Sequence, residues 1–350
     1  MAPRAPMRVS GALNGIQYQD VTPLLGRDYP NLQLSSIVSD DAKVRDLAIT
    51  ASERGVLFFH NQCIPVSDFK ILMQKLGELT GKPATSKLHK HEFASENNYH
   101  LGIPESMDPE VYTVSNVNND KFFDSFLNPS DMKFASRSWH ADESFERVPA
   151  DYTGFKMIKC PKTGGDTVWA SAYAAYERMS EPWQRFAEGL TASHGDSTSA
   201  DSLNKKGLKF RAEERGSPEN VGTELEAVHR VVQTNPVTGW KSLYGLGYQV
   251  SFGGINGVTD YENQIMQAYF LRLIADNHDL QIRHKWKPYD VAIWDNRSVF
   301  HNVTNDFVGE RLALRVVSIG NKPYLDPNST TRSAALRLRD EGGANGQDEY

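Results

Sequence analysis

Two histidines and one aspartate have the spacing of metal ligands. In the segment SRSWHADESFE, His140 and Asp142 are two residues apart, and residues i and i+2 of a strand point to the same side. His301, just beyond the apolar run DVAIWDN, offers a third ligand. Two histidines and one carboxylate leave three positions of an octahedron open, as in Fe(II) oxygenases that also bind a cosubstrate and O₂. A chance His-x-Asp pair is the alternative, since the chain has 10 histidines and 44 acidic residues.

A second set of residues could bind an anion. Arg311 and Arg315 are four residues apart in RLALRVVSIG, so on a strand they face the same way as Ala313, and the small residue leaves room inside a barrel. The arginine fork matches a carboxylate with two parallel hydrogen bonds. Two inward arginines are costly without anionic partners, so we expect a ligand such as a 2-oxo acid. The alternative is an edge strand with both arginines in water.

The elements that must position these residues begin with helices. Ser39 precedes DDAKVRDLAITASER and Gly55 follows it, which predicts a helix between an N-cap and a C′ glycine. Ser67 is expected to cap a second helix in SDFKILMQKLGEL. After Thr259, apolar positions with a period of 3.6 predict a helix over residues 260–277. Two shorter helices fit SAYAAYERMS and PWQRFAEGL.

The remaining recognisable elements are strands. They are GVLFFHN, YTGFKMI, DTVWAS, WKSLYGL, QIRHKW, DVAIW and RLALRVVSIG, separated by Gly, Pro, Asn and Asp. Helices gathered at the start and between runs of strands predict an α+β fold with a β-sandwich or barrel at its centre. A doubly wound parallel sheet fits less well, because strands and helices do not alternate regularly.

We expect a single domain over residues 1–325. Residues 82–138 have weak periodicity and turn-prone runs, which predicts a long lid-like insertion unless short strands lie hidden in it. Residues 326–350 are rich in Ser, Arg, Gly and Asp, so we predict a polar C-terminal tail that frays or packs peripherally.

Composition restricts the partners. A formal charge of −6 and a pI near 6.0 provide no broad basic surface for nucleic acid or anionic membrane, so a small molecule is the expected partner. Cys63 and Cys160 lie in apolar, strand-like stretches, which predicts reduced structural thiols without a disulfide. No apolar run reaches transmembrane length and no targeting signal is recognised, so we expect a cytoplasmic protein. A homodimer is left open, because dimers are the commonest oligomers.

Several segments together resemble the TauD/TfdA family of dioxygenases, in particular its fungal-type members. They follow the same order over roughly residues 50–325 and include GVLFFHNQ, WHADESFE, PADYTGF, PKTGGDTVWAS, VGTELEAVH, TNPVTGWKSLY, HDLQIRHKW and DVAIWDNRSVFHNVTNDFVGER. This resemblance implies a double-stranded β-helix (jelly-roll) core, with Fe(II) and 2-oxoglutarate as cofactor and cosubstrate and O₂ as oxidant.

The resemblance also implies roles for individual residues. His140, Asp142 and His301 resemble the iron ligands. Thr167 in GGDTVW is similar to the family threonine that hydrogen-bonds 2-oxoglutarate, although by itself it fits an ordinary β-branched strand residue equally well. Arg311 resembles the arginine that pairs with the 2-oxoglutarate carboxylate, and Arg315 the one closer to the substrate anion. Flanking residues are expected to support the site; these are Trp139, Trp294, Asp295, Asn296 and Arg297.

Two positions depart from the family pattern around the substrate. Members that act on sulfonates hold the anion with a histidine in L-H-x-H-P; the segment LHKHE makes His91 the candidate, but Glu92 replaces the proline, and a surface-exposed polar loop is the alternative. The residue after the aspartate ligand is Glu143 in place of an apolar one. Strand alternation points the Glu143 side chain away from Asp142, which leaves two alternatives. Either Glu143 is solvated, or it reaches the pocket, where it would repel a sulfonate and attract an ammonium group.

The resemblance implies a reaction in which 2-oxoglutarate becomes succinate and CO₂ while hydrogen is abstracted from substrate, with hydroxylation or a related oxidation as the result. Glu143 with Arg315 favours a small amino-acid-like or secondary-metabolite substrate. The alternatives are a sulfonate or alkyl-sulfate dioxygenase of the taurine-dioxygenase type and a non-catalytic jelly-roll binding protein. A zinc hydrolase could use the same three ligands, but it would leave the arginine pair without a purpose.

Overall fold

The computed structural model describes residues 5–92, 108–116, 134–195 and 210–344. Its helices are α1 (Asp41–Arg54), α2 (Val66–Leu79), α4 (Ala172–Glu177), α5 (Glu181–Glu188), α7 (Val250–Gly253), α8 (Asp260–Ala275) and α9 (Arg332–Ala344). Its strands are β1 (Gln19–Asp20), β2 (Arg27–Tyr29), β3 (Val56–Phe59), β4 (Tyr112–Ser115), β5 (Ala150–Lys159), β6 (Thr167–Ser171), β7 (Thr191–Gly195), β8 (Glu226–Arg230), β9 (Val232–Thr234), β10 (Lys241–Leu243), β11 (Gly254–Ile255), β12 (Gln281–His284), β13 (Val291–Asp295), β14 (Val299–Val303) and β15 (Leu312–Ile319).

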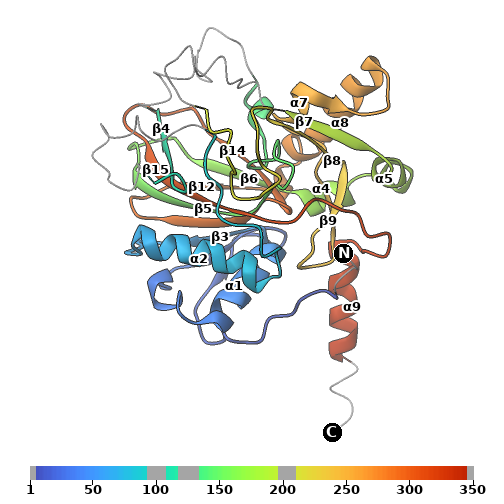
Figure 1. Ribbon diagram of the computed structural model, residues 1–350. Coiled ribbons are helices and arrows are strands. Elements are labelled where there is room, and N and C mark those ends of the chain that lie inside the picture. Colours follow the sequence, from blue (N-terminus) through green and yellow to red (C-terminus); the bar gives the residue numbers. More distant parts are fainter. Residues whose placement is uncertain (1–4, 93–107, 117–133, 196–209, 345–350) are drawn as a thin grey trace.

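Two sheets make up the centre of the molecule (Figure 1). The larger has the order β1-β2-β3-β13-β5-β15-β4 and the smaller the order β12-β6-β14. Neighbouring strands are antiparallel, apart from the parallel pair β2 and β3. The inner faces share one apolar cluster, to which Phe58, Phe155 and Trp294 contribute from the larger sheet and Trp169 from the smaller. This is the predicted jelly-roll core of an α+β fold.

The alternation of side chains along the larger sheet separates two cores. On β13, Val291 and Ile293 pack in a cluster with α1 and α2, whereas Ala292 and Trp294 belong to the cluster between the sheets. Successive strand residues point to opposite faces, and both faces are covered here. Burial on both sides explains why these strands read as continuous apolar runs.

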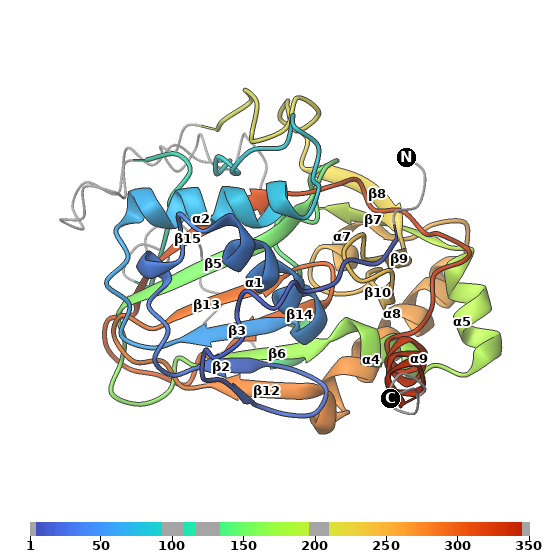
Figure 2. The ribbon, with the colours of Figure 1, turned by 90° about the horizontal axis from the view of Figure 1, so that it is seen from below.

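Helices α1 and α2 lie side by side across the outer face of the larger sheet (Figure 2). Both helices begin at a different residue from the one that the sequence predicted. The N-cap of α1 is Asp40 rather than Ser39, because the Asp40 side chain accepts a hydrogen bond from the backbone N–H of Lys43. Helix α2 begins after Pro65 rather than Ser67. Gly55 ends α1 with a φ of 77°, as the sequence predicted.

Helix α4 contacts both β14 of the smaller sheet and helix α8. Helix α8 begins with the capping box of Thr259 and Glu262, which agrees with its predicted start. The region also holds the short sheets β11-β7-β8 and β10-β9. Residues of β7, β10, α4 and α8 share an apolar cluster with Trp139 and Ala141, so this part of the fold supports the segment that carries His140.

The predicted lid-like insertion is largely outside the described residues, which omit 93–107 and 117–133. Within it, the structure contains the strand β4, which the sequence analysis did not identify and which pairs with β15. The predicted tail includes helix α9, whose Arg339 forms an ion pair with Glu53 at 2.7 Å. The helix therefore packs peripherally.

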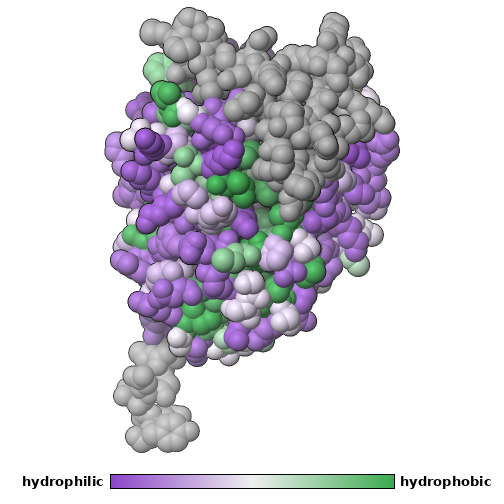
Figure 3. Space-filling model, turned by 90° about the vertical axis from the view of Figure 1, so that its left-hand side faces the viewer, coloured by the Kyte–Doolittle hydropathy of each residue, from purple (hydrophilic) through white to green (hydrophobic). Residues whose placement is uncertain are grey.

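The cysteines form no disulfide, as predicted, although Cys63 is exposed rather than buried. Among the described residues, no helix has both the length and the apolar character needed to cross a bilayer. Among the coloured residues of the face in Figure 3, hydrophilic side chains predominate, with apolar groups between them.

His60 connects three strands of the larger sheet at one end. It follows β3, and its ring nitrogens lie 3.0 Å from Asp28 on β2 and 3.1 Å from Asp290 before β13. Hydrogen bonds to Asp28 and Asp290 raise the pKa of His60 to about 10. The unfolded imidazole has a pKa near 6.5, so the stabilisation is complete below that pH and is lost as the pH rises through about 10.

We therefore predict that His60→Gln lowers the free energy of unfolding by about 1–2 kcal/mol at pH 6, after allowance for solvent screening of the half-buried ring. The difference between variant and wild type should shrink toward zero near pH 10. Urea unfolding across this pH range measures it, with the exposed His278→Gln as control. A difference independent of pH would contradict the ionic role of His60.

Candidate active site

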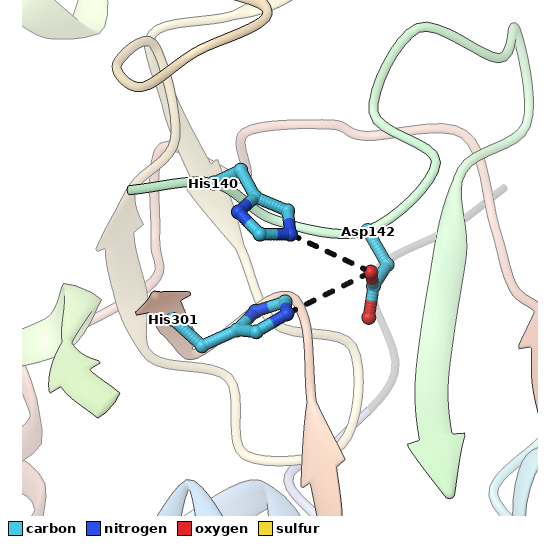
Figure 4. Close-up of side chains that lie close together, drawn as sticks. All are labelled: His140, Asp142 and His301. Atoms are coloured by element: carbon cyan, nitrogen blue, oxygen red, sulfur yellow. Dashed lines mark ion pairs between the residues drawn. The ribbon is translucent and has the colours of Figure 1, made fainter. Parts of the chain in front are cut away.

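His140, Asp142 and His301 converge on one point between the sheets (Figure 4). The Nε2 atoms of His140 and His301 lie 3.9 Å and 3.7 Å from Asp142 Oδ1. Their ring centroids are 4.1 Å apart. Two imidazole nitrogens and a carboxylate oxygen form a donor set that suits first-row divalent metals such as Fe(II).

Backbone pairing places the two histidines opposite each other. His140 and His301 form an antiparallel bridge with hydrogen bonds of 3.1 Å and 2.9 Å, and His301 lies on β14. The prediction that His140 and Asp142 share one face of a strand was wrong in its geometry, because the chain leaves the bridge and enters a turn at Asp142. Asp142 is positioned instead by its backbone N–H, which donates to Asn296 Oδ1 at 3.1 Å.

The protonation states suit metal binding. His140 Nδ1 lies 2.9 Å from the carbonyl oxygen of Ser138, so Nδ1 donates and Nε2 carries the lone pair. Burial lowers the pKa of His301 to about 3, which keeps this imidazole neutral. Burial alone would raise the pKa of Asp142, but Arg315 and the neighbouring histidines lower it to about 2. At neutral pH the carboxylate is ionised.

A chain of hydrogen bonds orients Asp142. Asp142 Oδ2 accepts from the Thr153 hydroxyl at 2.8 Å, and Thr153 Oγ1 accepts from Asn296 Nδ2 at 2.9 Å. The Trp294 indole donates to Asn296 Oδ1 at 3.0 Å. Trp294 and Asn296 were predicted to support the site. Thr153 was missed, because a threonine in a strand carries no signal in the sequence.

Asp295 and Arg297 form a second supporting unit further from the metal ligands. The Arg297 Nε and Nη2 groups each donate to Asp295 at 2.8 Å, and Ser52 donates to the same carboxylate at 2.6 Å. All three residues are buried. This pair fixes the turn between β13 and β14, and therefore the start of the strand that carries His301.

Arg311 and Thr167 meet between the sheets. Arg311 is 5% exposed; its Nε donates to the carbonyl of Gly165 at 2.9 Å, and its Nη2 lies 3.5 Å from Thr167 Oγ1. The Trp286 indole also donates to Thr167 Oγ1, at 3.0 Å, so the threonine hydroxyl hydrogen can be donated to a ligand. The sequence analysis did not identify Trp286.

The charge of Arg311 has no ion-pair partner among the described residues. Burial lowers the pKa of Arg311 to about 10, and the charges of Asp166 and Cys160 act in the opposite direction. A buried guanidinium without a carboxylate beside it is a site for an anion. Gly165 allows the close approach of Arg311, because a Cβ at this position would lie 3.2 Å from Arg311 Cδ. Its φ of 69° also lies in the left-handed region that favours glycine.

Arg315 has different surroundings. Its Nη1 donates to Asp142 Oδ1 at 2.6 Å and its Nη2 to Glu143 Oε1 at 2.7 Å. Burial alone would lower the pKa of Arg315, but these two carboxylates raise it. Strand β15 lies between β5 and β4, so the alternative of an edge strand with both arginines in water is wrong.

Of the two alternatives for Glu143, the solvated one is wrong. Glu143 is 4% exposed and has a φ of 51°, so the chain turns at this residue and does not alternate as a strand. Its carboxylate joins Asp142 at Arg315. The structure therefore brings Glu143 to the same arginine as the aspartate of the triad.

His91 lies near this group and not in a surface loop. His91 and Glu92 are both buried, and the His91 ring stacks on Tyr112 of β4 at a centroid distance of 3.7 Å. The Arg315 guanidinium lies 5.1 Å from the same Tyr112 ring. Burial, together with Arg315, lowers the pKa of His91 well below its usual value.

The geometry defines a jelly-roll protein with a His-Asp-His cluster that could hold a metal ion and a separate buried arginine beside Thr167. Residues 17–317 match the family model described as taurine catabolism dioxygenase TauD, TfdA family. The chain therefore belongs to the TauD/TfdA family.

Two fungal proteins resemble the chain over nearly its whole length. The alpha-ketoglutarate-dependent dioxygenase btcD of Neocamarosporium betae is 40% identical over 95% of this chain and 98% of its own. The alpha-ketoglutarate-dependent dioxygenase esdpJ of Penicillium shearii is 38% identical over 95% and 96%. The crystal structure of a taurine dioxygenase from Burkholderia xenovorans has the same fold, with a TM-score of 0.64, 22% identity and coverage of 90% and 94%. The chain is accordingly a non-haem dioxygenase that uses Fe(II), 2-oxoglutarate and O₂.

We predict that Thr153→Val weakens Mn(II) and Fe(II) binding roughly 10- to 100-fold, because it removes the hydrogen bond that orients Asp142. Anaerobic calorimetry with each metal measures the effect. Thr113→Val is the matched control, since Thr113 is a buried strand threonine whose hydroxyl has no hydrogen-bond partner within the described part of the chain. Equal metal affinity in both variants would contradict the role of Thr153.

Proposed function

We propose that His140, Asp142 and His301 hold Fe(II), and that Thr167 and Arg311 bind the distal carboxylate of 2-oxoglutarate. The observation that carries this proposal is the buried Arg311, which lies beside Thr167 without a carboxylate of its own among the described residues. His91, Glu143 and Arg315 are proposed to face the substrate.

Fe(II) with 2-oxoglutarate supplies the chemistry that activates O₂ and abstracts hydrogen from the substrate, with succinate and CO₂ as coproducts. The chain's residues bind and orient the reactants. His140 and His301 present ring nitrogens to the metal, and Thr153 holds Asp142 in position. Arg311 fixes one end of the cosubstrate, while the aromatic cluster of Phe155, Trp169 and Trp294 keeps water from the inner face of the larger sheet.

For the substrate, we propose a small amino-acid-like or secondary-metabolite compound that is hydroxylated or otherwise oxidised. The pairing of Glu143 with Arg315 supports this, because the site offers a carboxylate and a guanidinium side by side. The second candidate is a sulfonate or alkyl sulfate, favoured by the presence of Arg315 and buried His91 near the triad and by the family description. Succinate release from 2-oxoglutarate with amino acids and with sulfonates as substrates distinguishes the two.

We predict that anaerobic addition of Fe(II) and 2-oxoglutarate to the protein produces the weak visible charge-transfer band of a chelated 2-oxo acid. His140→Ala and His301→Ala should abolish the band, because each removes one of three ligands. Circular dichroism confirms that the variants are folded. A folded wild-type protein that gives no band would exclude the proposed site and favour a non-catalytic binding protein, or a zinc hydrolase if Zn(II) supports hydrolysis without 2-oxoglutarate.

We further predict that Arg311→Gln raises the half-saturating concentration of 2-oxoglutarate roughly 10- to 100-fold, since a bidentate charged contact is replaced by a neutral one. The same band, titrated with 2-oxoglutarate at saturating Fe(II), measures this. Arg283→Gln is a control, because Arg283 is half-exposed and already pairs with Asp166 and Asp306. An unchanged half-saturation in Arg311→Gln would assign the carboxylate to another residue.

We also propose that the protein acts in the cytoplasm and that residues 1–325 form one catalytic domain. Neither cysteine forms a disulfide, which supports the first proposal. We further propose a homodimer, because two-fold homo-oligomers are the commonest oligomers. Light scattering of the full chain tests this proposal.

A further inference from the structure

We propose that Glu143 sets the substrate charge of this enzyme: it occupies Arg315 as an internal anion and so excludes a substrate with a net negative charge. This inference rests on the proposed function, since it concerns the same pocket beside the metal ligands. It restricts the substrate class to uncharged or zwitterionic small molecules.

The contacts of Arg315 support the first step. Both terminal amino groups of its guanidinium donate to carboxylates, to Asp142 at 2.6 Å and to Glu143 at 2.7 Å. The planar guanidinium binds a carboxylate or sulfonate best through two adjacent N–H groups. With one group on the metal ligand and the other on Glu143, the terminal pair is already engaged. Only Nε of this guanidinium has no hydrogen-bond partner among the described residues, so a substrate anion that binds both terminal groups would have to displace Glu143.

The second step concerns how firmly Glu143 is held. Its side chain is 3% exposed and also lies 3.8 Å from His89. A φ of 51° places the residue in the left-handed region, which non-glycine residues adopt at a cost. The turn thus aims the carboxylate at Arg315 and not into solvent. A displaced Glu143 would remain a buried carboxylate without its cation, which is strongly unfavourable.

The third step is the charge balance. Fe(II) and the 2-oxoglutarate dianion cancel each other, and Asp142 and Glu143 cancel Arg311 and Arg315. Among these groups the loaded site is neutral. If Glu143 loses its charge, the same site gains one positive charge next to Arg315, and a monoanion then becomes the complementary ligand.

The test compares two ligands of the same shape, 1-propanesulfonate and the uncharged 1-propanesulfonamide. Binding to the full-length protein is measured by calorimetry and by the shift in melting temperature, both with anaerobic Fe(II) and 2-oxoglutarate and without metal. The variants are Glu143→Gln, which preserves side-chain shape, and Glu143→Asn, since asparagine tolerates the left-handed backbone.

We expect both variants to bind propanesulfonate at least about tenfold more tightly than the wild type, with less than about a twofold change for the sulfonamide. The added anion should also raise the melting temperature of the variants more than that of the wild type. The double variant Glu143→Gln, Arg315→Gln should lose the gain, which assigns the anion to Arg315 and not to Arg311. Glu181→Gln, which removes the same charge on exposed α5, should gain nothing.

Equal propanesulfonate affinity in wild type and folded Glu143→Gln would overturn the proposal, and so would a gain that persists in the double variant. This experiment can fail or succeed independently of the test of the proposed function. If the wild type gives no charge-transfer band, the iron and 2-oxoglutarate assignment fails, whereas the sulfonate comparison in metal-free protein still decides the role of Glu143.

Discussion

The site depends on keeping the carboxylate of Asp142 ionised in the space between two sheets. Burying a lone carboxylate costs on the order of several kcal/mol, and Asp142 is only 1% exposed. Thr153 and Arg315 offset that cost through short hydrogen bonds to its two oxygens. Of the two adjacent histidines, His301 is buried and neutral, and His140 is partly exposed. Both present ring nitrogens toward Asp142. The fold thus prepares a negatively charged ligand before any metal arrives.

The two sheets contribute different parts of the site. His301 and Thr167 belong to the smaller sheet, whereas Arg315 lies on β15 of the larger one and Arg311 directly precedes it. The site therefore exists only when the sheets pack face to face, through the aromatic cluster around Trp169 and Trp294. Because the same packing closes the core and assembles the site, destabilising the interface should disturb both together.

The two inward arginines differ through their neighbours and not through their own chemistry. Arg311 contacts a backbone carbonyl and the Thr167 hydroxyl, so its charge is available to a ligand. Arg315 is shared by Asp142 and Glu143. Four residues apart, the chain thus holds one arginine that contacts no carboxylate among the described residues and one that pairs with two.

The sequence by itself determined the types and approximate positions of the main elements, because apolar periodicity and capping residues are local signals. It also determined that Arg311, Ala313 and Arg315 share a face, since strand alternation follows from backbone geometry. Only the tertiary structure decided that Asp142 and Glu143 lie in a turn, that His91 is buried against Tyr112, and that Thr153 and Trp286 contact the site residues. Those features arise from contacts between distant segments and from a positive φ at a glutamate, and neither has a local pattern that a sequence displays.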